Sequence, residues 1–301
     1  MRFALTGGTG LIGRRLIGEL RKRGDEVTVL TRNPAKANLP GVEVVAWQPA
    51  DEPAPAQALE DRDVIVNLLG ESVGQRWTSE SKRAIIDSRV LGTRNLIAGI
   101  EATTTRPRAL VSGSAIGYYG SDGAATRQPE SAPPGDDFLA SVTVAWEREA
   151  QTAETLGLRV AIIRTGVLLD PAGGALASML RPFKMGLGGP IAGGRQYISW
   201  IHSDDLVALF IAAADNGWRG AYNGTAPEPV TNKEFSKTLG RVLHRPAVMR
   251  VPGFVLRRVL GEMADIVTGG QRAVPERALA EGFRHRYSDL ETALKETTSS
   301  R

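Results

Sequence analysis

The chain has 301 residues, a net charge of +4 and a pI near 9.5, with 42% hydrophobic and 23% charged residues. This composition is ordinary for a globular protein that buries a sizeable core. The absence of cysteine excludes disulfides and thiolate metal sites, and with only three histidines we expect no metal centre.

The N-terminal segment predicts a strand, a glycine-rich turn and a helix. An apolar run at residues 3–5 leads into TGGTGLIG at residues 6–13, and apolar residues then recur at helical spacing up to Gly24. Glycines in such a turn bring backbone N–H groups against a pyrophosphate at the helix N-terminus. A tight turn without a ligand is the alternative, but the flanking elements favour a dinucleotide site. We expect cofactor contacts from Gly7, Thr9, Gly10, Leu11, Ile12 and Gly13.

The end of the second predicted strand indicates which dinucleotide binds. This strand spans residues 26–31 and is followed by Arg32, at the distance where an acidic residue would hold a ribose 2′-hydroxyl. A guanidinium at this position matches a 2′-phosphate instead, in a forked and charge-assisted geometry. The alternative is a solvated loop arginine. Arg32 and the missing acid favour NADP(H) over NAD(H).

Short β-branched runs then alternate with longer helical patterns. Strands are expected at residues 42–46, 64–69, 109–112 and 160–163, and helices at 79–102 and 136–156. This order predicts an α/β fold, a Rossmann doubly wound parallel sheet that binds ligands beyond the carboxyl ends of its strands. Leu69, Gly70 and Ser112 are at or near such strand ends, so we expect them at the cofactor.

The last third of the chain predicts a second, smaller lobe. Residues 173–200 are rich in glycine but contain aromatic and apolar side chains, which indicates loops over the substrate rather than a linker. Residues 230–296 show helical patterns, and a polar tail follows at 297–301. The expected division is an NADP-binding domain at 1–170, with segments such as 195–225 returning to it, and a mainly helical substrate-side and C-terminal lobe at 171–301.

Several motifs together resemble the short-chain dehydrogenase/reductase superfamily in its extended, sugar-nucleotide-epimerase-like form. They are TGGTGLIG, DRDVIVNLLG, VSGSAIGYYG, RVAIIRTGVLL and YISWIHSDDLV, in this order. The segments SGSAIGYYG, ISWIHSDDL and VPGFVLRRVLGEMADIVTGGQRAVPERALAEGF are similar to the atypical branch called epimerase family protein. The resemblance covers nearly the whole chain. It implies a cofactor fold and a substrate lobe, but it does not imply a substrate.

The chain departs from the superfamily's catalytic pattern, in which a tyrosine precedes a lysine by four residues. Aligning the glutamate that follows this pair with Glu147 puts Leu139 at the tyrosine position and Thr143 at the lysine position. A leucine cannot transfer a proton, and a threonine supplies no charge. Arg89 stands where the extended pattern has asparagine, and it could bind a phosphate, bind a carboxylate or form a structural salt bridge. We count Arg89 among the cofactor residues.

Any acid/base group must therefore come from elsewhere in the cleft. Ser114 aligns with the superfamily's serine after the fifth strand, and Tyr118 and Tyr119 are the nearest phenols, although either could simply wall a pocket. We therefore expect Ser114, Tyr118 and Tyr119 to be the catalytic residues. His202 could approach a substrate from the second lobe, but helix capping by Ser203 or Asp204 explains its polar cluster more simply. Glu130 is more simply a solvated loop acid than a general base.

Two functional hypotheses remain. One is an NADP-dependent oxidoreductase or epimerase that acts on a hydroxylated small molecule, and the other is an NADP(H)-binding regulatory or scaffold protein that has lost catalysis. Basic residues on the first helix are explained by a solvated face, so we expect no nucleic acid. The longest apolar run, residues 206–214, is too short to span a bilayer, and because the sequence leads directly into a strand we expect no signal peptide. We expect a cytoplasmic protein without a membrane partner, which could form a homodimer.

Overall fold

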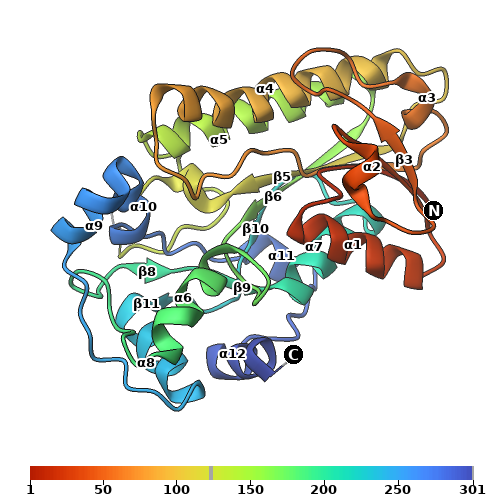
Figure 1. Ribbon diagram of the computed structural model, residues 1–301. Helices are drawn as coiled ribbons and strands as arrows, with labels where there is room; N and C mark the ends of the chain where they lie inside the picture. The colour runs from red at the N-terminus through yellow and green to blue at the C-terminus, as the bar shows by residue number, and fades with distance from the viewer. Residues whose placement is uncertain (122–124, 300–301) are drawn as a thin grey trace.

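The computed structural model describes residues 1–121 and 125–299, and its centre is a sheet of seven parallel strands (Figure 1). The strand order is β10-β6-β5-β4-β1-β2-β3. In register, Leu5 lies between Val29 and Val66, so the middle of the sheet consists of aliphatic residues buried on both faces, as parallel sheets require. The strands are β1 Arg2–Thr6, β2 Glu26–Thr31, β3 Glu43–Ala46, β4 Val64–Asn67, β5 Ala109–Ala115, β6 Arg159–Thr165 and β10 Gly220–Gly224.

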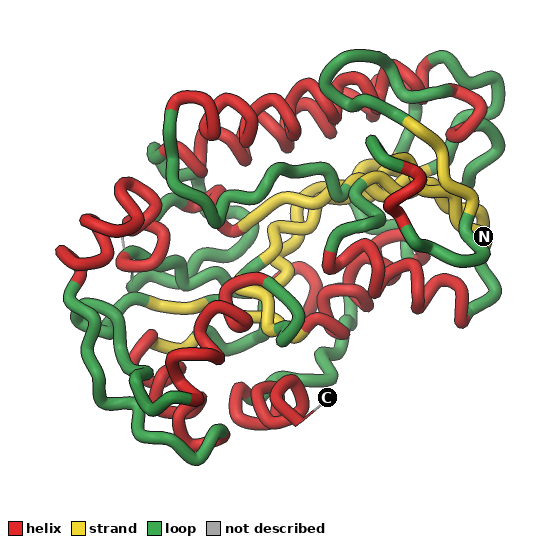
Figure 2. Tube along the Cα trace, viewed as in Figure 1, coloured by secondary structure: helices red, strands yellow, loops and turns green. Residues whose placement is uncertain are grey.

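Helices cover both faces of this sheet, which Figure 2 shows as a yellow layer between red helices. Leu16 and Leu20 of α1 (Leu11–Lys22) join Leu206 and Phe210 of α7 (Ser203–Asp215) in one core cluster. On the other face α4 (Ser79–Glu101) and α5 (Phe138–Gln151) pack beside each other. Short elements complete this part: α2 Pro34–Ala37, α3 Ala56–Leu59, and the 3₁₀ turns η1 Ile116–Tyr119 and η2 Thr152–Leu156. The fold is the predicted doubly wound Rossmann sheet.

The predicted boundaries differ from the observed ones mainly at strand ends. The strand expected at 64–69 ends at Asn67, because Leu68 to Gly70 turn away to border the cleft. The strands expected at 109–112 and 160–163 are longer, and the helix expected at 136–156 ends as the 3₁₀ turn η2. Strand β10, formed by GAYNG, has no apolar run that would have predicted it.

A second lobe surrounds its own apolar cluster, which contains Trp200 and Phe235. Its strands form two small sheets, and three of its helices enclose the cluster, whereas α9, η3 and α10 lie at one edge (Figure 1). Residues 300 and 301 of the expected polar tail lie outside the described residues, and Thr297 to Ser299 belong to α12. The elements are β7 Val167–Leu169, α6 Gly174–Lys184, β8 Tyr197–Ile198, β9 Trp200–His202, β11 Val230–Thr231, α8 Asn232–Val242, α9 Gly253–Leu260, η3 Gly261–Met263, α10 Ala264–Thr268, α11 Glu276–Ala280 and α12 Leu290–Ser299.

Residues 269–274 join the C-terminal part of the chain to the rest of the molecule. A Cβ added to Gly269 would lie 2.1 Å from the Ser121 carbonyl oxygen, and one added to Gly270 would lie 2.4 Å from the Tyr197 carbonyl oxygen. Only glycine allows such a close backbone approach. The Asn223 amide on β10 then donates to the Val274 carbonyl at 2.9 Å.

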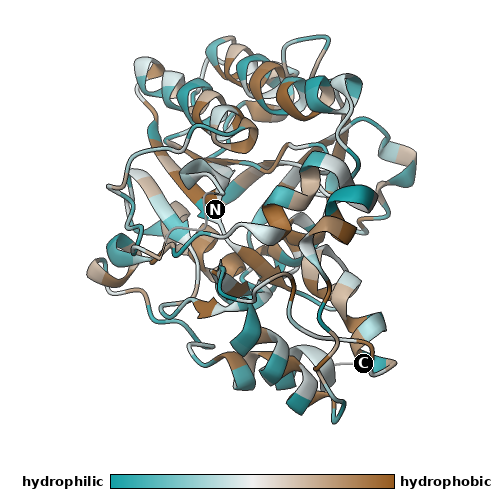
Figure 3. Ribbon diagram, turned by 90° about the vertical axis from the view of Figure 1, so that its left-hand side faces the viewer, coloured by the Kyte–Doolittle hydropathy of each residue, from teal (hydrophilic) through white to brown (hydrophobic). Residues whose placement is uncertain are grey.

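Hydropathy follows these layers: in Figure 3 brown runs along the central strands, and the surrounding helices show mixed faces. Over residues 1–121 and 125–299, no helix is both long and apolar enough to cross a membrane. Within the same ranges, no group of three or more histidine, aspartate or glutamate side chains is arranged to hold a metal ion.

Candidate functional site

The glycine turn between β1 and α1 is shaped by close backbone contacts. Gly7 has a φ of +66°, and a Cβ there would lie 2.3 Å from the Leu68 carbonyl oxygen. A Cβ on Gly13 would lie 2.4 Å from the Gly7 carbonyl oxygen, which explains how closely α1 approaches the turn. Gly10 is the N-cap of α1, with no side-chain cap and no acidic residue in the first turn. The helix N-terminus is therefore left with backbone N–H groups for an anion.

A groove runs over this turn as two hollows of about 210 and 230 Å³ that share Gly7, Gly10 and residues 68–70. The first hollow reaches Arg32 and Trp47 at the ends of β2 and β3. The second reaches Ser114 and Thr165 at the ends of β5 and β6. The predicted cofactor residues that line the groove are Gly7, Thr9, Gly10, Leu11, Ile12, Gly13, Arg32, Leu69, Gly70 and Arg89.

Ser112, also predicted at the cofactor, is fully buried beneath this groove. There the Asn67 amide donates to the Thr93 hydroxyl at 2.9 Å, and its second contact, to the Ser112 hydroxyl, is 3.4 Å long. The Thr6 hydroxyl donates to Asn67 Oδ1 at 2.8 Å, which ties β1 to β4. These bonds fix the strand ends under the groove. Sequence reasoning missed Asn67, although a lone polar residue that ends an apolar strand was the available signal.

Arg32 and Arg89 present two different guanidinium environments. Arg32 is exposed and has neither an ion pair nor a hydrogen bond within the described residues. Arg89 donates to the carbonyls of Glu71 and Ile85, and its guanidinium lies 5.1 Å from the Trp146 ring centroid. Burial lowers the pKa of Arg89 to about 10, although the charge of Glu71 opposes this shift. In the part of the chain that the structure describes, Arg89 has no carboxylate salt bridge and instead borders the groove.

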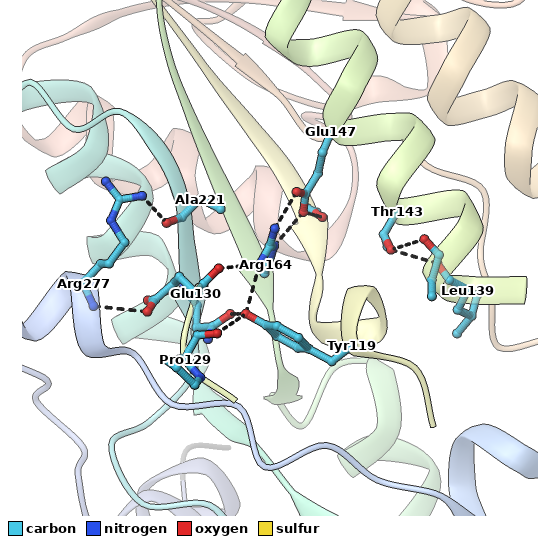
Figure 4. A network of polar contacts seen from close by, with 12 residues as sticks. Tyr119, Pro129, Glu130, Leu139, Thr143, Glu147, Arg164, Ala221 and Arg277 are labelled. Carbon is cyan, nitrogen blue, oxygen red and sulfur yellow. Dashed lines mark hydrogen bonds and ion pairs between the residues drawn. The ribbon is translucent and has the colours of Figure 1, made fainter. Parts of the chain in front are cut away.

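Ser114 belongs to a buried ionic cluster at the end of the groove formed by β5 and β6. Its hydroxyl donates to Glu147 Oε1 at 2.6 Å. Arg164 on β6 clamps the Glu147 carboxylate with two bonds of 2.8 Å, as Figure 4 shows. Burial lowers the pKa of Arg164, but the hydrogen bonds and charge of Glu147 outweigh it and raise this pKa above its ordinary value. The Glu147 carboxylate thus accepts hydrogen bonds from both the Arg164 guanidinium and the Ser114 hydroxyl.

The two candidate tyrosines have different surroundings. The Tyr119 hydroxyl is buried, donates to Asn223 Oδ1 at 2.8 Å and accepts from Arg164 at 3.0 Å. Burial raises the pKa of Tyr119 to about 12, against the opposing effect of the Arg164 charge. Tyr118 is half-buried, its ring covers the Arg164 guanidinium at 3.4 Å, and its hydroxyl has no hydrogen-bond partner within the described residues. Neither tyrosine lines the two hollows of the groove, and of the two phenols only that of Tyr118 lacks a hydrogen-bond partner in these ranges.

The positions of the missing tyrosine–lysine pair offer no proton transfer. The Thr143 hydroxyl donates back to the carbonyls of Leu139 and Ala140 on its own helix, as Figure 4 shows for Leu139. Leu139 lies beside Gly117, where an added Cβ would be 3.3 Å from the leucine Cβ. The helix that carries the catalytic pair in the superfamily therefore contributes only Glu147 to the cluster.

Two further expectations are corrected by the structure. Glu130 is not a solvated loop acid, because it is only 8% exposed and accepts from the backbone N–H groups of Asn223 and Arg277. Helix α7 is capped as expected, but by His202 rather than by Ser203 or Asp204: His202 Nδ1 accepts from Asp204 N at 3.2 Å. Burial lowers the pKa of His202, which favours the neutral ring that this cap requires.

A larger hollow of about 440 Å³ lies apart from the glycine turn. It is lined by residues 119–121 and 135–137 on one side and by Arg257, Asp265, Thr268 and Gly269 on the other. None of its lining residues belongs to the cofactor groove, so its size does not identify it as the dinucleotide site. It lies between the segment that follows β5 and the region of α9 and α10.

The sheet order, the glycine turn and the groove beyond the strand ends define a Rossmann-type dinucleotide-binding protein. Residues 3–224 match the model of the NAD dependent epimerase/dehydratase family, and residues 251–297 match a domain of unknown function, DUF1731. The chain belongs to the NAD dependent epimerase/dehydratase family.

Among its relatives, the epimerase family protein YfhF of Bacillus subtilis is 41% identical over 100% of this chain and 99% of its own length. A chloroplastic SDR39U1 homolog of Arabidopsis thaliana is 40% identical over 98% of this chain and 86% of its own. The crystal structure of human epimerase family protein SDR39U1, isoform 2, with NADPH has a TM-score of 0.89 and 34% identity and covers 100% of both chains.

Proposed function

We propose that this protein binds NADP(H) in the groove and is an oxidoreductase or epimerase for a hydroxylated small molecule. The observation that carries the proposal is the groove itself, which joins an unpaired arginine at one end to an oriented serine at the other. The NADPH in the human relative, which is similar over the full chain, supports the choice of cofactor.

The described residues fit each part of such a cofactor. The first turn of α1 leaves N–H groups for the pyrophosphate, and no side chain at Gly10 fills that space. Arg32 would hold the 2′-phosphate in a forked, charge-assisted pair, because it lines the groove and makes no ion pair with a carboxylate of the described residues. Arg89 adds positive charge between the turn and Ser114. When bound, the nicotinamide supplies the oxidation or reduction of the substrate carbon.

The geometry of Ser114 suggests how a substrate would be oriented. Because its proton is committed to Glu147, the Oγ lone pairs are left for the groove. Such a serine accepts a hydrogen bond from a substrate hydroxyl, so an alcohol is bound in preference to a carbonyl compound. Tyr118, whose hydroxyl has no partner in the described ranges, would exchange the proton, whereas Tyr119 would act through its structural bonds.

Calorimetric titration with NADPH and NADH tests the cofactor assignment. We expect NADPH to bind at least about tenfold more tightly, a difference of about 1.4 kcal/mol, and Arg32→Ala to remove most of this preference. Lys22→Ala is the matched control, because Lys22 lies at the far end of α1, where it pairs with Glu19. Equal affinity of the unaltered protein for both cofactors would refute the assignment.

The second candidate, an NADP(H)-binding regulatory or scaffold protein, is favoured by one observation. The helix that carries the superfamily's catalytic pair here has only Leu139 and a self-bonded Thr143 at those positions. A metabolite screen that follows nicotinamide absorbance distinguishes the two functions. Turnover that falls in Ser114→Ala or Tyr118→Phe, with NADPH affinity unchanged, supports the enzyme. No turnover, together with a partner whose affinity changes with NADPH, supports the regulator.

A further inference from the structure

Two segments of the second lobe, which include the end of α6 and most of α9, lie side by side along one edge of the molecule. They are residues 181–192 and 241–258, and together we call them the edge ribbon. Arg245 Nε donates to the Lys184 carbonyl at 3.0 Å, Met249 N to the Gly188 carbonyl at 3.2 Å, and Ala192 N to the Val251 carbonyl at 2.9 Å. Its blue segment descends the left-hand side of Figure 1, and Figure 3 looks onto that side.

The edge ribbon lies in the part of the sequence where positive and negative residues are most unevenly distributed. Residues 171–203 and 235–261 carry nine lysines and arginines and no aspartate or glutamate, so the remaining residues have a net charge of −5. Arg241 pairs with Glu291, and Arg257 pairs with Asp265. Of the cations in the edge ribbon, five are exposed and make no ion pair within the described residues: Arg181, Lys184, Arg245, Arg250 and Arg258.

The same ribbon exposes apolar side chains. Eight large hydrophobic residues are exposed in the part of the chain that the structure describes, and six of them lie here. Phe254 is 76% exposed and Val248 is 75% exposed, and they belong to a cluster rather than being scattered singly over the surface. The other four are Met185, Leu187, Met249 and Val255.

This combination decides which partner fits. A second copy of the chain, placed symmetrically on this edge, would bring one row of cations against another, which opposes association. The ribbon lies along the outside of the fold (Figure 1), and its six large apolar side chains are exposed. An anionic bilayer offers both an electrostatic and a hydrophobic interaction. Its phosphate headgroups attract lysine and arginine, and its acyl boundary accommodates Phe, Leu, Met and Val.

We propose that the edge ribbon docks the protein on the surface of a bilayer that contains anionic lipid. Phe254 and Val248 insert at the acyl boundary, and Arg250 and Arg258 lie among the headgroup phosphates. The attachment is peripheral and uses no membrane-spanning helix. It departs from the expectation of no membrane partner, which rested on the absence of a spanning segment alone. It is also independent of the proposed NADP(H) site.

Vesicle cosedimentation of the full chain tests the proposal, with phosphatidylcholine vesicles alone and with phosphatidylserine added. We expect binding only to the anionic vesicles, weakened by raised salt. Arg250→Ala with Arg258→Ala should weaken binding roughly fivefold for each charge removed. Phe254→Ser with Val248→Ser should weaken it about tenfold or more. Leu279→Ser, on α11, is the matched control, because Leu279 is 45% exposed but lies outside the ribbon, and it should leave binding unchanged.

Three outcomes would overturn the proposal. One is equal sedimentation with neutral and anionic vesicles, and another is an equal loss of binding in Leu279→Ser. The third is a concentration-dependent dimer, seen by light scattering, that Phe254→Ser with Val248→Ser abolishes while vesicles bind neither form. All variants should keep the melting temperature and NADPH affinity of the unaltered protein, so a failure of this proposal is distinguishable from a failure of the cofactor assignment.

Discussion

The bond from Ser114 to Glu147 can be measured directly, because the chain contains no cysteine. Ser114→Cys therefore introduces a single thiol, placed to donate to the Glu147 carboxylate. A hydrogen bond to a charged group contributes about 1.5–3 kcal/mol, so the carboxylate should reduce the thiolate fraction roughly tenfold to a hundredfold. Since the thiolate is the reactive form, iodoacetamide near pH 8.5 should alkylate this cysteine more slowly than a free thiol, by the same factor.

The comparison variant is Ser114→Cys combined with Glu147→Gln, in which an amide can donate to the sulfur and Arg164 loses its counter-charge. We expect alkylation to become faster than for a free thiol. Adding Thr143→Val to Ser114→Cys is the control, because Thr143 is on the same helix but bonds only to its own backbone. Melting curves and NADPH titration confirm that each variant is folded. If the glutamine variant reacts no faster than Ser114→Cys alone, the oriented-serine argument is wrong.

The remaining predictions concern the turn, the tyrosines and pH. Gly10→Val should remain folded, because its Cβ would meet only one carbonyl, at 3.2 Å, but titration should show that it no longer binds the dinucleotide. Gly13→Val should instead lower the melting temperature. Tyr119→Phe should lose about 1–3 kcal/mol in urea unfolding, because buried partners stay unpaired, and an equal loss in Tyr118→Phe would contradict this. Burial lowers the pKa of His202 in the folded protein. Below the ordinary histidine pKa near 6.5, the unfolded chain therefore binds more protons than the folded one. The melting temperature should fall as the pH drops from about 7.5 to 5.5. His202→Asn keeps a capping acceptor and should reduce this dependence; an unchanged slope would remove His202 as its source.

The fold could be predicted where its signals are local. The glycine turn, the first helix and the alternation of strands and helices are all encoded within stretches of a few residues. Strand β10 could not be predicted, because its sequence GAYNG has little strand character of its own. It pairs in parallel with β6, and Arg277, more than fifty residues further along, binds its Ala221 carbonyl at 2.8 Å.

The candidate site could be predicted only in part for the same reason. Spacing located the residues around the turn and brought Ser114 to the correct strand end. The cluster of Ser114, Glu147 and Arg164 joins three separate elements, β5, α5 and β6, and no local pattern encodes it. One signal was nevertheless available: Arg164 directly follows the apolar run VAII in the strand RVAIIRT, and a charge buried in such a place must find a partner.

The close backbone approach of Gly269 and Gly270 to Ser121 and Tyr197 limits how this chain can be truncated or recombined with a relative. A protein truncated before this point would leave the Asn223 amide without its Val274 acceptor, and the Ser199 hydroxyl without the N–H of Ala273 that it accepts at 2.9 Å. Both groups are buried, so the loss would reach the central sheet. The domain of unknown function is therefore no exchangeable module. Grafting it from a relative would require its contact surfaces on the cofactor lobe to be transferred with it.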